Sequence, residues 1–207
     1  MMFLELHILQ NFSPANLNRD DTGAPKDCQF GGYRRARISS QCTKRSVRKH
    51  PAFREAVLHN AGDLGVRTKR LVARLKGLLE DKGLEAETAD AVAHMVVELL
   101  GLKTAKGEKT QYLLYLGEKD IQELAELAAR HAEDLFGKKA KDVSKDVGKA
   151  FKELLDKKKK KDAYAADIAL FGRMIADDKD MNVDAACQVA QALSTNKVDM
   201  EMDYYTA

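Results

Sequence analysis

The side chains best suited to chemistry lie in one run between Gly31 and Lys49, GGYRRARISSQCTKRSVRK. From Arg34 to Lys49 the run holds seven basic residues and no acidic one. Gly31–Gly32 permits a turn that lets the main chain approach a phosphate closely. The arginine guanidinium groups that follow are planar forks, which suit bidentate contact with phosphate. The run therefore predicts a surface that binds a polyanion.

A short helix is expected inside this run. Ser39 and Ser40 are good N-cap residues, and Pro51 interrupts the helical pattern. Backbone amides at a helix N-terminus form an anion site. Four side chains follow at i, i+3, i+4 and i+7 and share one face of the helix: Gln41, Lys44, Arg45 and Arg48. Because few aromatic residues interleave, we expect sequence-independent contact with a nucleic-acid backbone.

The distribution of charge supports this interpretation better than the total does. The 207 residues have a net charge of +3, but residues 1–50 carry +5, residues 138–161 carry +7, and the rest sums to −9. Lysine-rich stretches are usually solvated faces, and for residues 138–161 that alternative is as good as a nucleic-acid surface. For residues 34–49 it is much weaker, since those residues also have the turn and the helix face.

Composition limits the class of protein. Apolar residues make up 44% of the chain, which excludes a wholly disordered protein. No apolar run approaches the ~20 residues needed to cross a bilayer, and the N-terminus lacks the basic leader of a signal peptide. Three widely spaced cysteines, Cys28, Cys42 and Cys187, predict a reducing compartment and a cytoplasmic protein. We expect no membrane partner.

Motifs for cofactors and metals are missing. The five histidines are scattered, there is no CxxC, and neither GxxxxGK[ST] nor GxGxxG is present, so we expect no cofactor, no metal and no catalytic residue. One pair in the loop after residue 9 is the exception. Asp20 and Asp21 could hold a divalent cation over a phosphodiester. We favour the alternative, in which they pair with Arg19 or cap the loop.

The elements that must position these residues follow from periodicity. Residues 2–9 alternate loosely and predict a strand, and residues 11–32 predict a long polar loop. From 51 to 156 the pattern predicts about four helices with leucine stripes, stopped at Gly83, Gly101 and Gly137, and a possible strand at 110–117. Residues 162–177 predict a strand and turn, residues 183–196 score as a helix, and residues 197–207 alternate as a strand or hairpin arm.

Four blocks of the sequence also carry a resemblance. LHILQNFSPANLNRDD, KDCQFGGYRRARISSQCTKRSVRK, DIALFGRM and STNKVDMEMDYYTA occur in this order from residue 6 to the last residue. Together they resemble the CasC family, the backbone subunits of the type I-E CRISPR surveillance complex Cascade. The region 52–160 matches that family only in its helical character.

The resemblance implies an α+β, hand-shaped fold. Residues 1–50 and 162–196 would form a palm of the ferredoxin-like, RNA-recognition-motif type, residues 51–161 helical fingers, and residues 197–207 the start of a thumb hairpin. The family chain is much longer, so we expect the sequence to lack the C-terminal part of the palm. The resemblance also makes residues 183–196 a strand that runs into the thumb, and we follow it against the compositional helix.

The resemblance implies a non-enzymatic scaffold. Copies of such subunits polymerise in a filament along the CRISPR guide RNA, together with other Cascade subunits, kink one base out at intervals, and leave the rest to pair with target DNA. The positions that match guide contacts are Arg19, Lys26, Arg35, Ser39, Gln41, Lys44, Arg45 and Arg48. Arg173 and Met174 match positions that pack against the displaced nucleotide, and Tyr205 matches an aromatic thumb residue.

Contact with DNA is implied more loosely. The fingers of the family present lysines to DNA, and the lysines here that correspond roughly are Lys138, Lys141, Lys145, Lys149 and Lys152. Two other classes stay open. Backbone subunits of type III complexes cleave target RNA with a metal at a loop aspartate, which would be Asp20 or Asp21 here. A helical protein–protein adaptor with incidental basic patches is the third interpretation.

Overall fold

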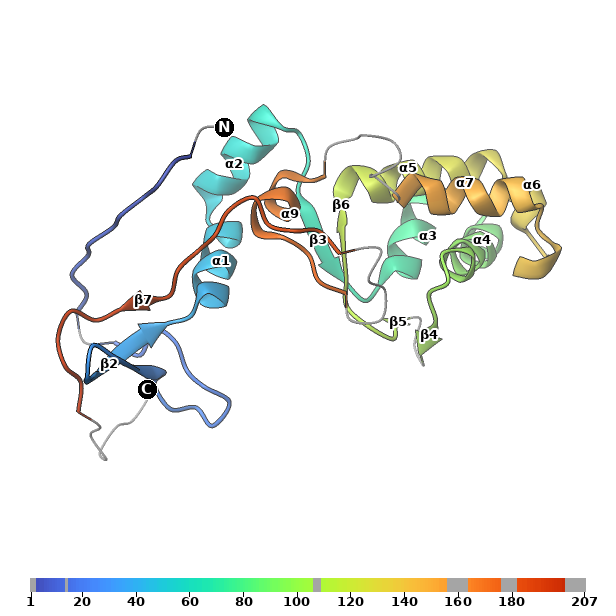
Figure 1. Ribbon diagram of the computed structural model, residues 1–207. Helices are drawn as coiled ribbons and strands as arrows, with labels where there is room; N and C mark the ends of the chain where they lie inside the picture. The colour runs from blue at the N-terminus through green and yellow to red at the C-terminus, as the bar shows by residue number, and fades with distance from the viewer. Residues whose placement is uncertain (1–2, 14, 106–108, 156–163, 176–181, 200–207) are drawn as a thin grey trace. The chain divides into compact units, whose positions relative to one another are not determined.

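The structure is a computed structural model that describes residues 3–13, 15–105, 109–155, 164–175 and 182–199. The chain folds into two units, a smaller one made of Met1–Val47 and Val189–Ala207 and a larger one made of Arg48–Gln188. Both contain helices and antiparallel strands or sheets in the described residues, so the expectation of an α+β chain is confirmed (Figure 1).

The smaller unit contains an antiparallel sheet of three short strands in the order β1-β2-β7. They are β1 (Asp27–Phe30), β2 (Tyr33–Ile38) and β7 (Ala192–Leu193). Phe30 pairs with Tyr33, and the two-residue turn between them has φ of +63° at Gly31 and +80° at Gly32. Two consecutive positive φ angles are what a tight hairpin needs, and glycine adopts them without strain. The predicted glycine turn is therefore confirmed, as the turn of a hairpin.

The helix expected from Ser39 and Ser40 is confirmed as α1 (Ser40–Lys49), which follows β2 directly. Pro51 starts the next helix rather than merely ending α1, because its fixed φ and missing N–H suit the first helical position. The described helices of the larger unit are α2 (Pro51–Asn60), α3 (Leu71–Asp81), α4 (Ala86–Leu99), α5 (Glu118–Arg130), α6 (Ala132–Leu135), α7 (Lys145–Leu155) and α9 (Ala166–Phe171), with a 3₁₀ turn at Ala140–Asp142.

Two small sheets complete the larger unit. β3 (Gly65–Thr68) pairs antiparallel with β6 (Leu114–Gly117), and β4 (Thr104–Ala105) pairs with β5 (Lys109–Thr110). The strand expected at 110–117 is thus confirmed in β6. All four residues of β6 are buried, which explains why it lacks polar alternation.

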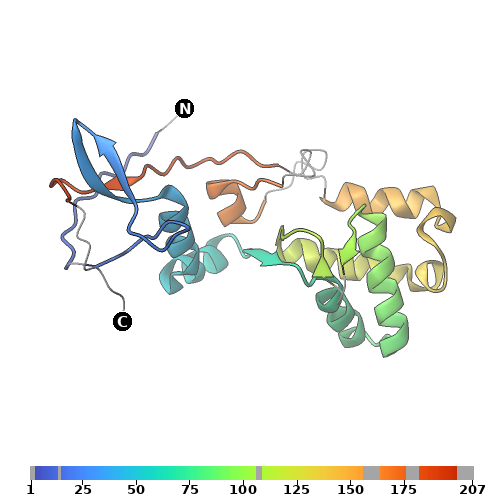
Figure 2. The ribbon, with the colours of Figure 1, turned by 90° about the horizontal axis from the view of Figure 1, so that it is seen from below.

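The hydrophobic core lies among α3, α4, α5 and α7, which lie side by side (Figure 2). The predicted leucine stripes of α3, α4 and α5 are part of this core. Leu75, Val92, Ile121, Leu124 and Phe151 are all completely buried. Replacing one such leucine with alanine typically costs about 2–5 kcal/mol, so this core dominates the stability of the larger unit. In the described residues, no helix is long and apolar enough to span a bilayer.

Three sequence predictions about local structure are wrong. Residues 3–9 form no strand; Phe3, Leu4, Leu6 and Ile8 are 78–85% exposed, and no described segment pairs with them. Alternation alone does not make a strand, because the backbone N–H and C=O groups still need a partner. The polar stretch 11–32 is not all loop, since it contains β1.

The third wrong prediction concerns the segments around residue 170. Residues 166–171 form α9 rather than a strand, and the helix ends at Gly172, whose φ is +76°. Residues 183–191 form neither the strand that we followed from the resemblance nor the helix that composition favours, apart from an isolated β-bridge at Val183. The amides of Ala186 and Cys187 donate to the carbonyls of Ala169 and Leu170, so they are not free for i→i−4 bonds. Only Ala192–Leu193 becomes a strand, and most of the predicted arm at 197–207 lies outside the described residues.

The finer features of the resemblance stay predictions. The described sheets have two or three strands and none closes into a barrel, and residues 162–188, expected in the palm, belong to the larger unit. The ferredoxin-like palm and the limits of palm, fingers and thumb are therefore taken up below as proposals.

Two glycines of the larger unit should respond oppositely to alanine. A Cβ at Gly172 would lie 2.9 Å from the carbonyl oxygen of Val183 and would sit at positive φ, whereas a Cβ at Gly77 in α3 meets nothing within 4 Å. We expect Gly172→Ala to destabilise the chain by about 1–3 kcal/mol. Gly77→Ala should stabilise it by about 0.5–1 kcal/mol. Thermal unfolding of both variants checks this, and equal shifts would contradict the geometry of α9.

Candidate nucleic-acid interface

The loop at residues 17–26 is fastened to the start of α1 by Asn18. The backbone amide of Ser39 donates to Asn18 Oδ1 at 2.8 Å, and the amide of Lys26 donates to the carbonyl of Asn18 at 2.9 Å. The Lys26 carbonyl in turn accepts from the amide of Arg37 at 3.0 Å. These hydrogen bonds therefore form one junction between the loop and the start of α1. It includes Arg19 and Lys26 from the loop and Gln41 from the helix. Sequence reasoning missed the role of Asn18, although it stands in the LNRDD block.

The first turn of α1 has a side-chain cap and no acidic residue. Ser39 Oγ accepts a hydrogen bond from the amide of Cys42 at 3.3 Å, and Ser39 is 7% exposed. Its hydroxyl is thus used as an N-cap, as the sequence predicted. With no carboxylate in the first turn, the remaining amides and the helix dipole leave a positive potential there for an external anion. Gln41 and Arg45 are exposed and Lys44 is half-buried.

Not every arginine of the basic run faces solvent. Arg35 donates from Nε to the carbonyl of Phe30 at 3.1 Å, and from Nη1 to the carbonyls of Ser194 at 2.9 Å and Thr195 at 2.7 Å. Arg37 Nη1 donates to Gln191 Oε1 at 2.9 Å. These guanidinium groups fasten the β1–β2 hairpin to the chain around β7. The geometry gives Arg35 a structural task beside the RNA contact predicted from the resemblance.

Two further predicted site residues lie in a buried polar cluster of the larger unit. The guanidinium of Arg48 lies 5.1 Å from the centroid of the Tyr115 ring and 5.0 Å from that of Phe171, and its Nε is 3.8 Å from Asp167 Oδ2. Arg173 is 8% exposed and donates from Nη1 to the carbonyl of Tyr115 at 2.9 Å. Met174 differs, since its side chain is 85% exposed. Tyr205 lies outside the described residues.

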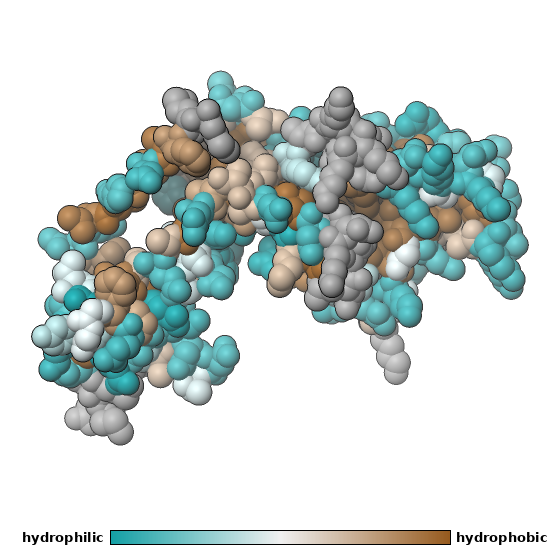
Figure 3. Space-filling view, in the orientation of Figure 1, coloured by the Kyte–Doolittle hydropathy of each residue, from teal (hydrophilic) through white to brown (hydrophobic). Residues whose placement is uncertain are grey.

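The lysines predicted to contact DNA are all exposed. Lys145, Lys149 and Lys152 follow at i, i+4 and i+7 on α7, away from the buried Val147, Phe151 and Leu154. Lys149 pairs with Glu153 at 3.7 Å, and Lys138, before α7, pairs with Asp134 at 3.4 Å. Exposed pairs of this kind contribute little to stability, so they leave the lysines available to an external anion. Hydrophilic side chains cover this part of the larger unit (Figure 3).

Asp20 caps its own loop, as the favoured alternative predicted. Its Oδ1 accepts from Thr22 Oγ1 at 2.7 Å, from the amide of Thr22 at 2.9 Å and from the amide of Ala24 at 2.9 Å. The hydrogen bond from the Thr22 hydroxyl is the main reason that the pKa of Asp20 lies below its usual value, and the backbone amides add to it. Among the described residues, no three His, Cys, Asp or Glu side chains gather as metal ligands would.

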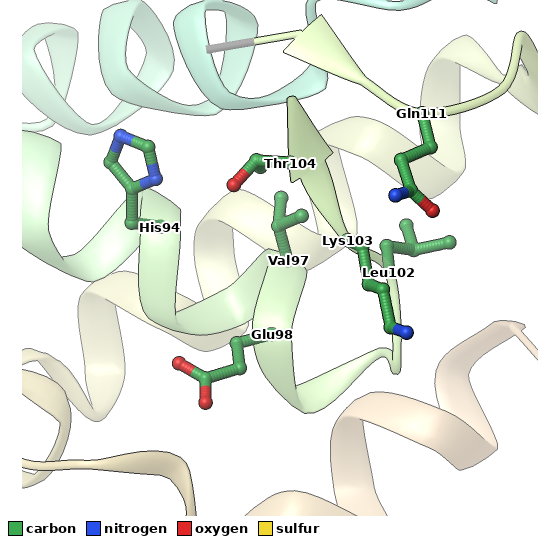
Figure 4. Close-up of a pocket in the computed structure, with 7 residues that line it drawn as sticks. All are labelled: His94, Val97, Glu98, Leu102, Lys103, Thr104 and Gln111. Carbon is green, nitrogen blue, oxygen red and sulfur yellow. The ribbon is translucent and has the colours of Figure 1, made fainter. Parts of the chain in front are cut away.

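One open pocket of about 380 Å³ lies elsewhere in the larger unit, where α4 ends near β4 (Figure 4). Its lining mixes two apolar side chains with a lysine, a carboxylate and other polar groups: His94, Val97, Glu98, Leu102, Lys103, Thr104 and Gln111. This mixture selects no one sign of ligand charge. None of the residues predicted to contact RNA or DNA lines the pocket, so it gives no reason to revise the site.

Comparisons with known proteins agree with the resemblance. The family model described as "CT1975-like protein" matches residues 4–207. A solved chain titled "CRISPR RNA-guided surveillance complex" is 32% identical with a TM-score of 0.65, and the match covers 87% of this chain and 55% of that one. Another, titled "CRISPR RNA-guided surveillance complex, pre-nicking", is 33% identical with a TM-score of 0.67 and coverages of 86% and 48%. The chain thus spans about half the length of these relatives. No curated protein matches.

The loop cap makes a prediction about pH. Because the pKa of Asp20 is lowered on folding, its contribution to stability is fully present above the unfolded pKa and is lost as the pH falls through the folded one. Thr22→Val removes the hydroxyl donor and should raise the pKa of Asp20 toward its usual value. Carboxyl carbon NMR titration measures this, with Thr195→Val, at an exposed threonine of the same unit, as the control. An Asp20 midpoint unchanged by Thr22→Val would contradict the cap.

Proposed function

The chain belongs to the CT1975-like family, and from that premise we propose that it is a backbone subunit of a CRISPR RNA-guided surveillance complex. Copies of the chain polymerise along a guide RNA beside the other subunits of the complex. They kink the guide at intervals and present its remaining bases to target DNA. The observation that carries this proposal is the basic junction between the loop 17–26 and the start of α1.

The guide is held through its backbone at that junction. Arg19, Gln41 and Arg45 are exposed there, and the capped helix start presents amides without a competing carboxylate. Cations and helix amides bind phosphate without reading bases. This fits a division of labour in which the protein reads shape and charge and base pairing reads sequence. Lys26, Lys44 and Ser39 also belong to the proposed contact surface for the guide. Arg35 contributes to this surface through the β1–β2 hairpin, which its hydrogen bonds stabilise.

The kink is assigned to Met174 and Tyr205. An exposed methionine is a soft apolar side chain that fits against an unstacked base. Tyr205 would add base–aromatic stacking, and that role rests on the resemblance alone. Arg48 and Arg173 contribute to the kink indirectly, through the buried cluster. There Arg48 faces Asp167, and Arg173 donates to the carbonyl of Tyr115.

The finer fold follows from the same proposal. The three-stranded sheet, α1 and α9 belong to an RNA-recognition-motif-type palm (residues 1–50 and 162–196), the helices from α2 to α7 to the fingers (residues 51–161), and the residues from 197 onward to the thumb. The exposed lysines of α7, with Lys138 and Lys141 before it, face target DNA. We assign no cleavage to Asp20 and Asp21, since one oxygen of Asp20 already accepts three hydrogen bonds from its own loop.

The first test addresses guide binding. Lys44→Ala/Arg45→Ala removes two cations that neutralise phosphates, so the slope of log K against log salt for single-stranded RNA should flatten by about 1.4. Lys82→Ala/Arg130→Ala, at two exposed basic residues of the larger unit, is the matched control and should leave the slope unchanged. Filter binding over a salt series measures both. Equal slopes for the two variants would contradict the assigned surface, and complexes that survive RNase treatment would favour a protein–protein adaptor.

A second test addresses DNA. Lys149→Ala/Lys152→Ala should weaken the capture of complementary DNA by a guide-loaded assembly, with a salt slope flatter by about 0.7 for each phosphate that is no longer neutralised. Guide binding itself should stay at the wild-type level. Lys103→Ala/Lys109→Ala, which removes two exposed lysines elsewhere in the same unit, is the control. DNA capture that falls equally in both variants would assign the effect to net charge rather than to α7.

A further inference from the structure

A buried carboxylate of the larger unit joins α9 to β3, to β6 and to the last residues of α1. Asp167, in α9, is 3% exposed. Its Oδ1 accepts from the amide of Gly65 in β3 at 2.7 Å, and its Oδ2 accepts from the hydroxyl of Tyr115 in β6. Arg48, near the end of α1, faces the same Oδ2 from 3.8 Å. A carboxylate this deep is tolerated only with such partners, and removing one of them is strongly destabilising.

The partners of Asp167 are themselves closely packed. Burial is the main reason that the pKa of Tyr115 is raised, so its hydroxyl stays protonated and donates at all ordinary pH values. A Cβ at Gly65 would lie 2.5 Å from a carbon of the Tyr115 ring. Only glycine therefore lets the ring approach β3 this closely. The Arg48 guanidinium stacks on the same ring, and also on Phe171 in α9.

The segment that follows α9 is fixed to the same cluster. The amide and carbonyl of Arg173 pair with the carbonyl and amide of Val183 at 3.0 and 2.9 Å, and its side chain donates to the carbonyl of Tyr115. Two residues on, the amide of Ile175 donates to Asn182 Oδ1 at 2.7 Å. Both neighbours of Met174 are thus anchored through backbone and side chain.

Met174 is the exception within this anchored segment. Arg173 is 8% exposed and Ile175 is 5% exposed, while Met174 between them is 85% exposed. An exposed apolar side chain gains nothing from the fold itself. On an anchored backbone, however, it can pack against a ligand with little further loss of conformational entropy. Precise sites depend on such support from the residues behind them.

We propose that Asp167 and the Tyr115 hydroxyl are positioning residues that hold Met174 in the pose in which it packs against a displaced guide base. This inference rests on the proposed function, because Met174 has this task only if the chain binds and kinks a guide RNA. It adds to that function a buried pair that never touches RNA. Arg48 and Arg173 act as the links between the pair and the segment that carries Met174.

The test uses the full chain assembled on single-stranded RNA in which adenines are replaced one at a time by 2-aminopurine, which brightens when it is unstacked. The wild type should show bright positions at a regular interval, and Met174→Ala should lower the contrast several-fold and leave a measurable remainder. Tyr115→Phe keeps the ring and removes only the hydroxyl. We expect it to lower the contrast several-fold while the salt slope of RNA binding stays at the wild-type value. Tyr112→Phe, at a half-buried tyrosine of the same unit, is the matched control and should keep the pattern.

A double variant separates positioning from a general loss of stability. If Tyr115 acts through Met174, Tyr115→Phe/Met174→Ala should lower the contrast no further than Met174→Ala alone. Asp167→Asn, which keeps an oxygen for the Gly65 amide, should behave as Tyr115→Phe does and serves if the tyrosine variant unfolds. A full 2-aminopurine pattern in folded Tyr115→Phe or Asp167→Asn would overturn the inference and leave the proposed function intact. A wild type without RNA binding or without periodic bright positions would instead overturn the proposed function.

Discussion

The hydrogen bonds of Asn18 are the constraint on which the nucleic-acid interface depends. Its side-chain oxygen fastens the loop 17–26 to the start of α1. Its carbonyl accepts from the amide of Lys26, and the Lys26 carbonyl in turn accepts from Arg37 in β2. Without this junction, the loop cations and the helix amides would be separate features with no common surface. The same junction leaves the Ser39 hydroxyl to cap α1, so a single amide side chain organises both the position of the cations and the exposure of the helix start.

The arginines divide into two groups that charge counting does not distinguish. Arg35 and Arg37 donate to acceptors around β7, and Arg48 and Arg173 belong to the cluster around Asp167 and Tyr115. A guanidinium can donate five hydrogen bonds in a fixed plane, so it serves equally well to fasten carbonyls inside a protein and to hold phosphate outside it. Exposure decides between these uses, and exposure depends on which segments meet after folding.

Local signals made much of the fold predictable. Short stretches of sequence are enough to predict the leucine stripes of α3, α4 and α5 and the N-cap at Ser39. This is because the backbone hydrogen bonds of a helix join residues only a few positions apart. Residues 3–9 and α9 were mispredicted because their state depends on partners distant in sequence, such as Val183 for the end of α9. Within the site, the N-cap at Ser39 and the Asp20 cap were predictable from the sequence, whereas Arg48, predicted on the same helix face as Gln41 and Arg45, lies against Asp167 instead. The contacts of Asn18, Asp167 and Tyr115 were not predictable, since they span 21 to 102 residues.

The hydrogen bonds of Arg35 to Ser194 and Thr195 also bear on the order in which the two units fold. They join residues 159 and 160 positions apart, and the smaller unit needs both sides of this gap. The larger unit is a single continuous stretch. On a ribosome it can therefore fold while the strand that completes the smaller unit is still being made, because contacts of high sequence separation form late. Until β7 has left the ribosome, the edge of β2 that pairs with β7 stays unpaired. A nascent chain would thus acquire its helical unit first and its sheet last.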